Sequence, residues 1–163
     1  MKVAADSGPL ISLASISLLD LLRSLFHSIH IPQAVYQEVV VAGKGRVGSE
    51  EVAGAVWIEQ HTIKNKRDVG KFMMDDCLDR GESEALVLAK EMNAGLLIVD
   101  DRVARDCAVR QNIPIIGTAG ILLLAKENHF VASVREPLDE LLHRGFYLSA
   151  SSYKRIIRTA RED

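Results

Sequence analysis

The sequence predicts a three-layer α/β/α fold with a mostly parallel sheet, and three observations lead to this prediction. Short apolar runs alternate with segments of helical periodicity along the 163 residues. The run from Leu96 to Val99 is too short and too apolar for anything but a strand buried on both faces. Hydrophobic residues make up 48% of the chain, enough for the core of one compact domain spanning residues 1–163.

In the first half of the chain, strands and helices are expected to alternate. Ser7 and Pro9 are typical of a helix start and end the first strand. Pro32 opens a further helix, and the Gly-rich segment 42–48 is expected to be a mobile loop. The expected strands are 2–5, 29–31 and 57–63; the expected helices are two parted near 15–17, one from 32, 49–55 and 72–78, with 64–70 as a charged connector.

The second half is organised around residues 79–102, a unit with acidic residues at both ends. Apolar residues at helical spacing from Ala85 to Met92 predict a helix, and Asn93 and Gly95 predict its end. A buried strand is expected at 96–99, and Asp101 is expected to cap the following helix. The remaining expected elements are helix 102–111, strand 113–116 and helices 121–126, 137–143 and 151–161.

Composition excludes several classes of protein. The formal net charge of −2 and the pI of about 6.2 provide no global basic field, so a nucleic acid would have to be bound by a local patch. Two cysteines form no disulfide framework, which favours a reducing, cytoplasmic setting. The five histidines form no pattern typical of a zinc site. No apolar run reaches the roughly 18 residues that a membrane helix needs, and Asp6 and Pro9 interrupt the only N-terminal run that could be a signal peptide.

Acidic residues are expected to meet at one edge of the sheet. Asp6, Asp100 and Asp101 follow predicted strands, and the carboxyl ends of parallel strands form the binding edge of such folds. Glu38 and Glu84 lie in predicted helices that can reach the same edge. Unpaired carboxylates repel by about 4 kcal/mol at ~4 Å in a partly screened site, and a divalent cation removes that cost. Oxygen ligands without His or Cys select Mg²⁺ or Mn²⁺.

Five segments of the chain resemble the PIN domain superfamily, and within it the compact prokaryotic proteins related to VapC-type toxins. They are VAADSGPL, IPQAVYQEVV, LDRGESEALVLAKE, LLIVDDRVAR and IPIIGTAGILLLAK, in that order along nearly the whole chain. The resemblance implies a metal-dependent endoribonuclease, with RNA as the substrate. It also suggests the toxin of a toxin–antitoxin pair, inhibited by a small antitoxin protein, and a homodimer without a membrane partner.

The resemblance carries site residues over one by one. It implies four acids that bind the metal and act in catalysis: Asp6, Glu38, Glu84, and Asp101 or Asp100. Ser7 and Thr118 match hydroxyl residues near the metal. The chain reads Val-Asp-Asp-Arg where the toxins have Thr-x-Asp followed by Asp-Phe, so the choice between Asp100 and Asp101 stays open. Glu82 is a rival to Glu84, although Glu84 precedes Ala85 as the family acid does.

Other interpretations of the same residues stay open. Asp6, Asp101 and Glu84 suit helix starts without any function, and Glu38 suits a solvated helix face. A PIN fold without catalysis, acting only as a binding module, is one alternative. The sequence Gly43 to Gly48 matches a nucleotide-binding fingerprint, but the fingerprint requires a preceding strand where a helix is expected. Weak contacts to the RNA backbone are expected from two helices, through Arg102, Arg105, Lys154 and Arg158.

Overall fold

A five-stranded sheet forms the centre of the computed structural model, which describes residues 1–163. All neighbouring strands are parallel, and their order is β3-β2-β1-β4-β5. The strands are β1 (Val3–Ala5), β2 (Ile29–Pro32), β3 (Ile58–His61), β4 (Leu96–Ile98) and β5 (Ile115–Ile116). The predicted α/β class is therefore confirmed, and the sheet is entirely parallel.

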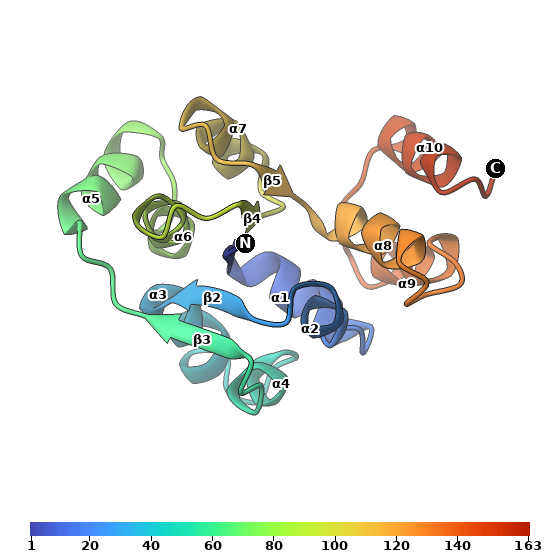
Figure 1. Ribbon diagram of the computed structural model, residues 1–163, viewed down its shortest axis with the longest axis horizontal. Helices are drawn as coiled ribbons and strands as arrows, with labels where there is room; N and C mark the ends of the chain where they lie inside the picture. Colours follow the sequence, from blue (N-terminus) through green and yellow to red (C-terminus); the bar gives the residue numbers. More distant parts are fainter.

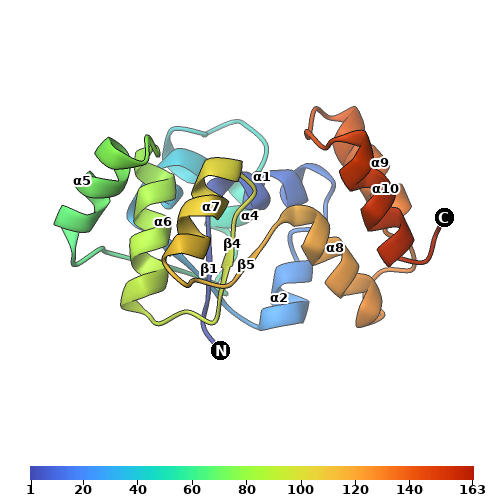
Figure 2. The same cartoon turned by 90° about the horizontal axis from the view of Figure 1, so that it is seen from above.

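Helices cover both faces of the sheet. Figure 1 shows α5, α6 and α7 on one side and α1, α2 and α8 on the other, with α9 and α10 beyond α8. Figure 2 shows the same separation from above. The helices are α1 (Ser7–Ser15), α2 (Leu21–Phe26), α3 (Gln33–Tyr36), the π-helical turn η1 (Gln37–Val41), α4 (Ser49–Ala53), α5 (Lys66–Asp75), α6 (Arg80–Glu91), α7 (Arg102–Arg110), α8 (Thr118–Glu127), α9 (Arg135–His143) and α10 (Ala150–Thr159).

Each face of the sheet has its own apolar core. Successive residues of a strand point to opposite faces, so Val3 and Ala5 of β1 join a cluster of 24 buried residues while Ala4 joins one of 16. The smaller cluster packs α5, α6 and α7 on the sheet; the larger one packs the remaining helices. Both faces of β1 are therefore buried, which explains why its residues are all small and apolar.

Most predicted elements form within a few residues of the expected bounds, but the helix predicted at 72–78 is misplaced. Helix α5 occupies Lys66–Asp75, so the segment read as a charged connector is largely helical. Asn65 caps the helix by accepting a hydrogen bond from the Asp68 amide at 3.1 Å. Val69 and Phe72, three residues apart, are buried in the smaller core. The apolar periodicity of this helix is weak, because only two of its residues are buried and charged residues occupy exposed positions.

The helix predicted after Pro32 contains a π-helical turn. After the four residues of α3, the Ala42 amide donates to Gln37 O, five residues back, at 2.7 Å. Such turns insert one extra residue into a helix and are frequent at functional sites. Gly43 follows the turn, and a Cβ there would lie only 2.4 Å from Val39 O, so a larger residue would not fit this backbone. Glu38 lies in the first turn of η1.

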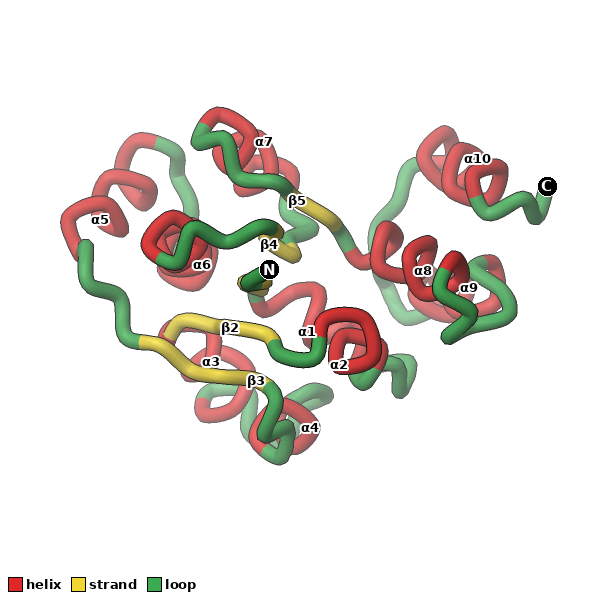
Figure 3. The backbone as a smooth tube through the Cα atoms, in the orientation of Figure 1, coloured by secondary structure: helices red, strands yellow, loops and turns green.

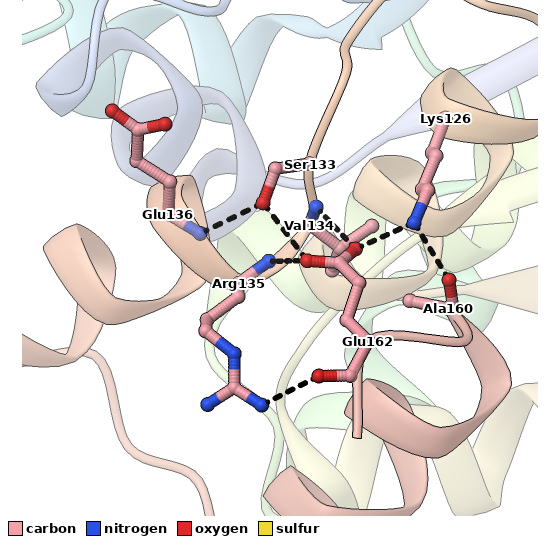
Figure 4. Close-up of polar contacts among 7 residues, drawn as sticks. All are labelled: Lys126, Ser133, Val134, Arg135, Glu136, Ala160 and Glu162. Atoms are coloured by element: carbon pink, nitrogen blue, oxygen red, sulfur yellow. Dashed lines mark hydrogen bonds and ion pairs between the residues drawn. The ribbon is translucent and has the colours of Figure 1, made fainter.

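The segment after α10 is fastened to α8 and α9 by the Glu162 carboxylate, as Figure 4 shows. Lys126 Nζ donates to it at 2.9 Å, Ser133 Oγ at 2.8 Å, and the amides of Val134 and Arg135 at 2.8 and 3.1 Å. Burial by itself raises the pKa of Glu162, but these donors outweigh burial and lower the pKa to about 2. The charged form of Glu162 therefore stabilises the packing of the last three helices.

Replacing Glu162 by Gln should lower the free energy of unfolding at pH 7 by about 1–3 kcal/mol, because several hydrogen bonds to a charge become weaker. The pKa is lower in the folded state, so this stabilisation is present above the unfolded pKa and is lost as the pH falls from about 4.5 towards 2. Urea unfolding of both proteins across that range would measure it. A wild-type advantage that persists undiminished at pH 2 would contradict this role of the carboxylate.

Candidate metal centre

Asp6 is a buried acid without a partner for one of its oxygens. It follows β1, and its amide donates to Ile98 O of β4 at 2.9 Å. The residue is 5% exposed, and Oδ1 is buried with no hydrogen-bond partner. It stands at the N-cap of α1 without making a side-chain cap. Its pKa is raised to about 7: burial is the largest cause, the charges of Glu82, Asp79 and Glu38 add to it, and the Ser7 amide opposes the change.

Glu38 and Asp79 approach Asp6 around Gly81. A Cβ at Gly81 would lie 2.9 Å from Glu38 Oε2, 3.5 Å from Asp79 Oδ1 and 3.8 Å from Asp6 Oδ1. Carboxylate oxygens of the residue after β1, of η1 and of the N-cap of α6 thus lie within 3.8 Å of one point, although they do not all come within 4.8 Å of one another. Glycine leaves this space free, because a Cβ at this position would displace the end of the Glu38 side chain.

Asp79 and Glu82 form a capping box at the start of α6. The Glu82 amide donates to Asp79 Oδ1 at 2.7 Å, and the Asp79 amide donates to Glu82 Oε2 at 2.9 Å. The pKa of Glu82 is raised, first by burial and then by the charges of Asp79, Asp101 and Glu38. Both acids therefore belong to the electrostatic environment of Asp6. Sequence reasoning missed Asp79, because the Asp-x-x-Glu pattern reads fully as a cap.

Glu84, further along α6, has different partners. Its Oε1 accepts a hydrogen bond from the Ala34 amide at 3.1 Å, and Oε2 lies 3.6 Å from Arg80 Nη1. The side chain is 13% exposed and lines, together with Glu38, a hollow of about 450 Å³. Glu84 thus holds the start of α3 against α6, and its charge is balanced by an arginine. Of the two rival acids, Glu82 is the one without an ion-pair partner.

The two aspartates that follow β4 also have different hydrogen-bond partners. Both oxygens of Asp100 accept hydrogen bonds from Thr118: Oδ1 from the amide at 2.8 Å and Oδ2 from Oγ1 at 2.6 Å. Asp100 and the buried Thr118 therefore tie the end of β4 to the start of α8. Asp101 is exposed, caps α7 by accepting from the Ala104 amide at 3.0 Å, and raises the pKa of Glu82. The charge of Asp101 thus acts on Glu82, and one of the Asp101 oxygens makes no hydrogen bond.

The acidic group contains no compensating base. No Lys or Arg forms an ion pair with Asp6, Glu38, Asp79, Glu82 or Asp101. Ionised carboxylates without partners are costly in a buried setting. A divalent cation fits the arrangement on three grounds: the orphaned Asp6 oxygen, the space kept open by Gly81, and donors that are all carboxylate oxygens. Ser7 lies buried next to Asp6 at the start of α1.

A cleft of about 810 Å³ begins at Asp100 and Asp101 and extends to α10. Arg102 and Arg105, two of the residues expected to contact RNA, line it together with Arg155 of α10. Lys154 and Arg158 are exposed on α10 but do not line this cleft. The periodicity indicated a basic face on α10; only the structure shows which of its cations is turned to the acidic edge.

The Gly43 to Gly48 loop lacks the context of a nucleotide-binding fingerprint. The helical turn η1 precedes it, and the helix that follows, α4, has only five residues. Gly45 and Gly48 have φ values of 83° and 96°, which explains glycine at both positions as a backbone requirement of the turn.

Comparison with models of protein families gives a match over nearly the whole chain. A family model described as a PIN domain matches residues 2–162. No curated protein matches the sequence. None of the helices combines the length and the apolar character needed to cross a membrane.

Ionisation of Asp6 should destabilise the metal-free protein. Because the folded-state pKa is raised to about 7, the folded state binds more protons than the unfolded state between about pH 4 and 7, so stability falls as the pH rises through that window. Asp6→Asn should remove this decline and raise the free energy of unfolding at pH 8 by about 1–4 kcal/mol. Urea unfolding in the presence of a chelator measures it. Asp20→Asn, at an exposed acid, is the matched control; the same decline in Asp6→Asn as in the wild type would contradict the assignment.

Proposed function

Because the chain belongs to the PIN domain family, whose members are generally nucleases, we propose that it is a Mg²⁺- or Mn²⁺-dependent endoribonuclease. The observation that carries the proposal is the buried Asp6 carboxylate, which has an unpartnered oxygen and three acidic neighbours but no cation. A structural protein gains nothing from such an arrangement, since burying an unpaired charge is costly.

The ion would be held by Asp6, Glu38, Glu82 and Asp101, with Asp79 beside them. This set differs from the one that the resemblance implied, because Glu84 has Ala34 and Arg80 as partners. An ion in such a site polarises the phosphodiester and lowers the pKa of a bound water. The protein's own part is to fix the carboxylates at the ends of β1 and β4, on η1 and at the start of α6.

The cleft beside the acidic group suits an RNA strand. Arg102 and Arg155 line it as exposed cations that can contact phosphates. Tyr147, 86% exposed, also lines the cleft and offers an aromatic face for stacking of a base. Because the net charge of the chain is −2, the protein as a whole does not attract RNA, and attraction depends on the arginines of this cleft.

A narrower role is part of the same proposal. The resemblance to VapC-type toxins suggests a toxin that a small antitoxin protein inhibits, a cytoplasmic location and a homodimer. The alternative is a PIN-fold module that binds RNA or protein without cleaving. A Mn²⁺ titration separates the two, because an inert module has no need of the ion and would not bind it at millimolar concentrations.

Substitutions of the acids should divide them into two groups. Asp6→Asn and Glu82→Gln should lower the rate of Mn²⁺-dependent cleavage of a fluorescent RNA by about 100-fold or more, because each removes a charge that holds the ion. Glu84→Gln should retain activity within about 10-fold, because the Gln oxygen still accepts the Ala34 amide. Circular dichroism checks the fold of each variant. Loss of activity in Glu84→Gln but not in Glu82→Gln would restore Glu84 as the ligand, and a fully active Asp6→Asn would refute the site.

Substitutions of the cleft arginines should weaken RNA binding through the salt-dependent part of the affinity. Arg102→Ala and Arg155→Ala should each reduce the slope of log K against log salt for single-stranded RNA by about 0.7. Arg158→Ala, on the same helix as Arg155 but outside the cleft lining, is the control and should leave the slope unchanged. Fluorescence anisotropy with Asp6→Asn as the background avoids cleavage. An equal effect of all three substitutions would contradict this path for the strand.

A further inference from the structure

Two histidines that are 31 positions apart in sequence meet on the edge of the sheet. His30 of β2 pairs in register with Glu59 of β3, and His61 lies two residues further along β3. Residues two apart on a strand point to the same face, so the three side chains converge. Figure 3 shows β2 and β3 side by side, away from β4 and β5. The five histidines form no zinc-site pattern in the sequence, and the structure places His30 as a buried strand residue.

The three donor atoms have the spacing of a metal site. His30 Nδ1 lies 2.9 Å from His61 Nε2 and 3.3 Å from Glu59 Oε2, and His61 Nε2 lies 3.8 Å from Glu59 Oε2. In a tetrahedral zinc site with bonds of about 2.0–2.1 Å, ligand atoms lie about 3.3 Å from one another. The observed distances lie on both sides of that value. An ion could therefore touch all three atoms with only small side-chain rotations.

One hydrogen bond, between His30 Nδ1 and His61 Nε2, joins the two imidazoles of this group. Two N–H groups pointing at each other across 2.9 Å would repel, so at most one of the facing nitrogens carries a proton. The hydrogen on one nitrogen faces the lone pair of the other nitrogen and the Glu59 carboxylate, and a metal ion that replaced this hydrogen would bind all three atoms. Burial lowers the pKa of His30, which favours the neutral imidazole that metals bind.

We propose that His30, Glu59 and His61 form a second metal site, which binds a zinc-class transition-metal ion with one coordination position left open. Two imidazoles and a carboxylate select zinc, cobalt, nickel or copper, whereas the acidic group at Asp6 selects Mg²⁺ or Mn²⁺. The His30, His61 and Glu59 side chains are 10%, 32% and 55% exposed, so the site is rooted in the sheet and open to solvent on one side. The ion would also cross-link the edge strand β3 to β2. The site is independent of the nuclease proposal, since none of its residues belongs to the acidic group.

Cobalt(II) is a suitable probe, because a tetrahedral cobalt site absorbs visible light and Mg²⁺ does not compete for nitrogen ligands. Untagged protein titrated with Co²⁺ in excess Mg²⁺ should bind one equivalent with a tetrahedral spectrum, and Zn²⁺ should displace it. His61→Ala and Glu59→Gln should weaken binding at least tenfold; both residues are partly exposed, so the core stays intact.

Two control variants show whether Co²⁺ binding depends on the proposed site. His143→Ala removes an exposed histidine at the end of α9, and Asp6→Asn changes only the acidic group. Both should bind Co²⁺ as the wild type does. The proposal is overturned if the wild type binds no Co²⁺, if His61→Ala binds it equally well, or if Asp6→Asn alone abolishes the spectrum.

Discussion

Strand β1 pairs with β2 on one side and with β4 on the other, and this central position determines where Asp6 lies. The chain crosses from one half of the sheet to the other around β1, so the carboxyl ends of β1 and β4 form the point where strand order reverses. Both faces of β1 are covered, so the residue that follows it is buried whatever its chemistry. A carboxylate at that point loses its hydration, and every neighbouring acid adds to the cost. The open space at Gly81 would admit an ion, and the absence of an ion-pair partner leaves the charge of Asp6 for that ion to balance.

The same sheet carries two donor sets of different chemistry. At the reversal point, the proposed oxygen donors come from four separate segments, so bringing them to one ion would depend on the whole fold. On the β2–β3 edge, two adjacent strands alone supply two nitrogens and one oxygen, and strand register is sufficient to place them. Mg²⁺ or Mn²⁺ would thus bind the oxygen donors and a zinc-class ion the histidine group, so the two kinds of ion would not compete for one site.

Sequence reasoning predicted what local pattern controls and failed where long-range geometry decides. The parallel α/β class, the strand-end acids Asp6 and Asp101 and the cap at Asp101 follow from periodicity and turn chemistry. The contact of Glu84 does not, because its partner is the Ala34 amide, 50 positions away. The first part of helix α5 was predicted as a connector, because charged residues are frequent there and only two residues of the helix are buried. His30 and His61 could not be joined without knowing that β2 and β3 are neighbours in a particular register.

The raised pKa of Asp6 also has a thermodynamic consequence for loading of the centre. With a pKa of about 7, a substantial fraction of the metal-free molecules carry a proton on this carboxyl group at neutral pH. A cation that binds there must expel that proton, so metal uptake and proton release are coupled. The observed binding enthalpy in calorimetry would then vary with the ionisation enthalpy of the buffer, and acidification would empty the centre. In the proposed centre, the buried acid would thus make occupancy respond to pH within the physiological range.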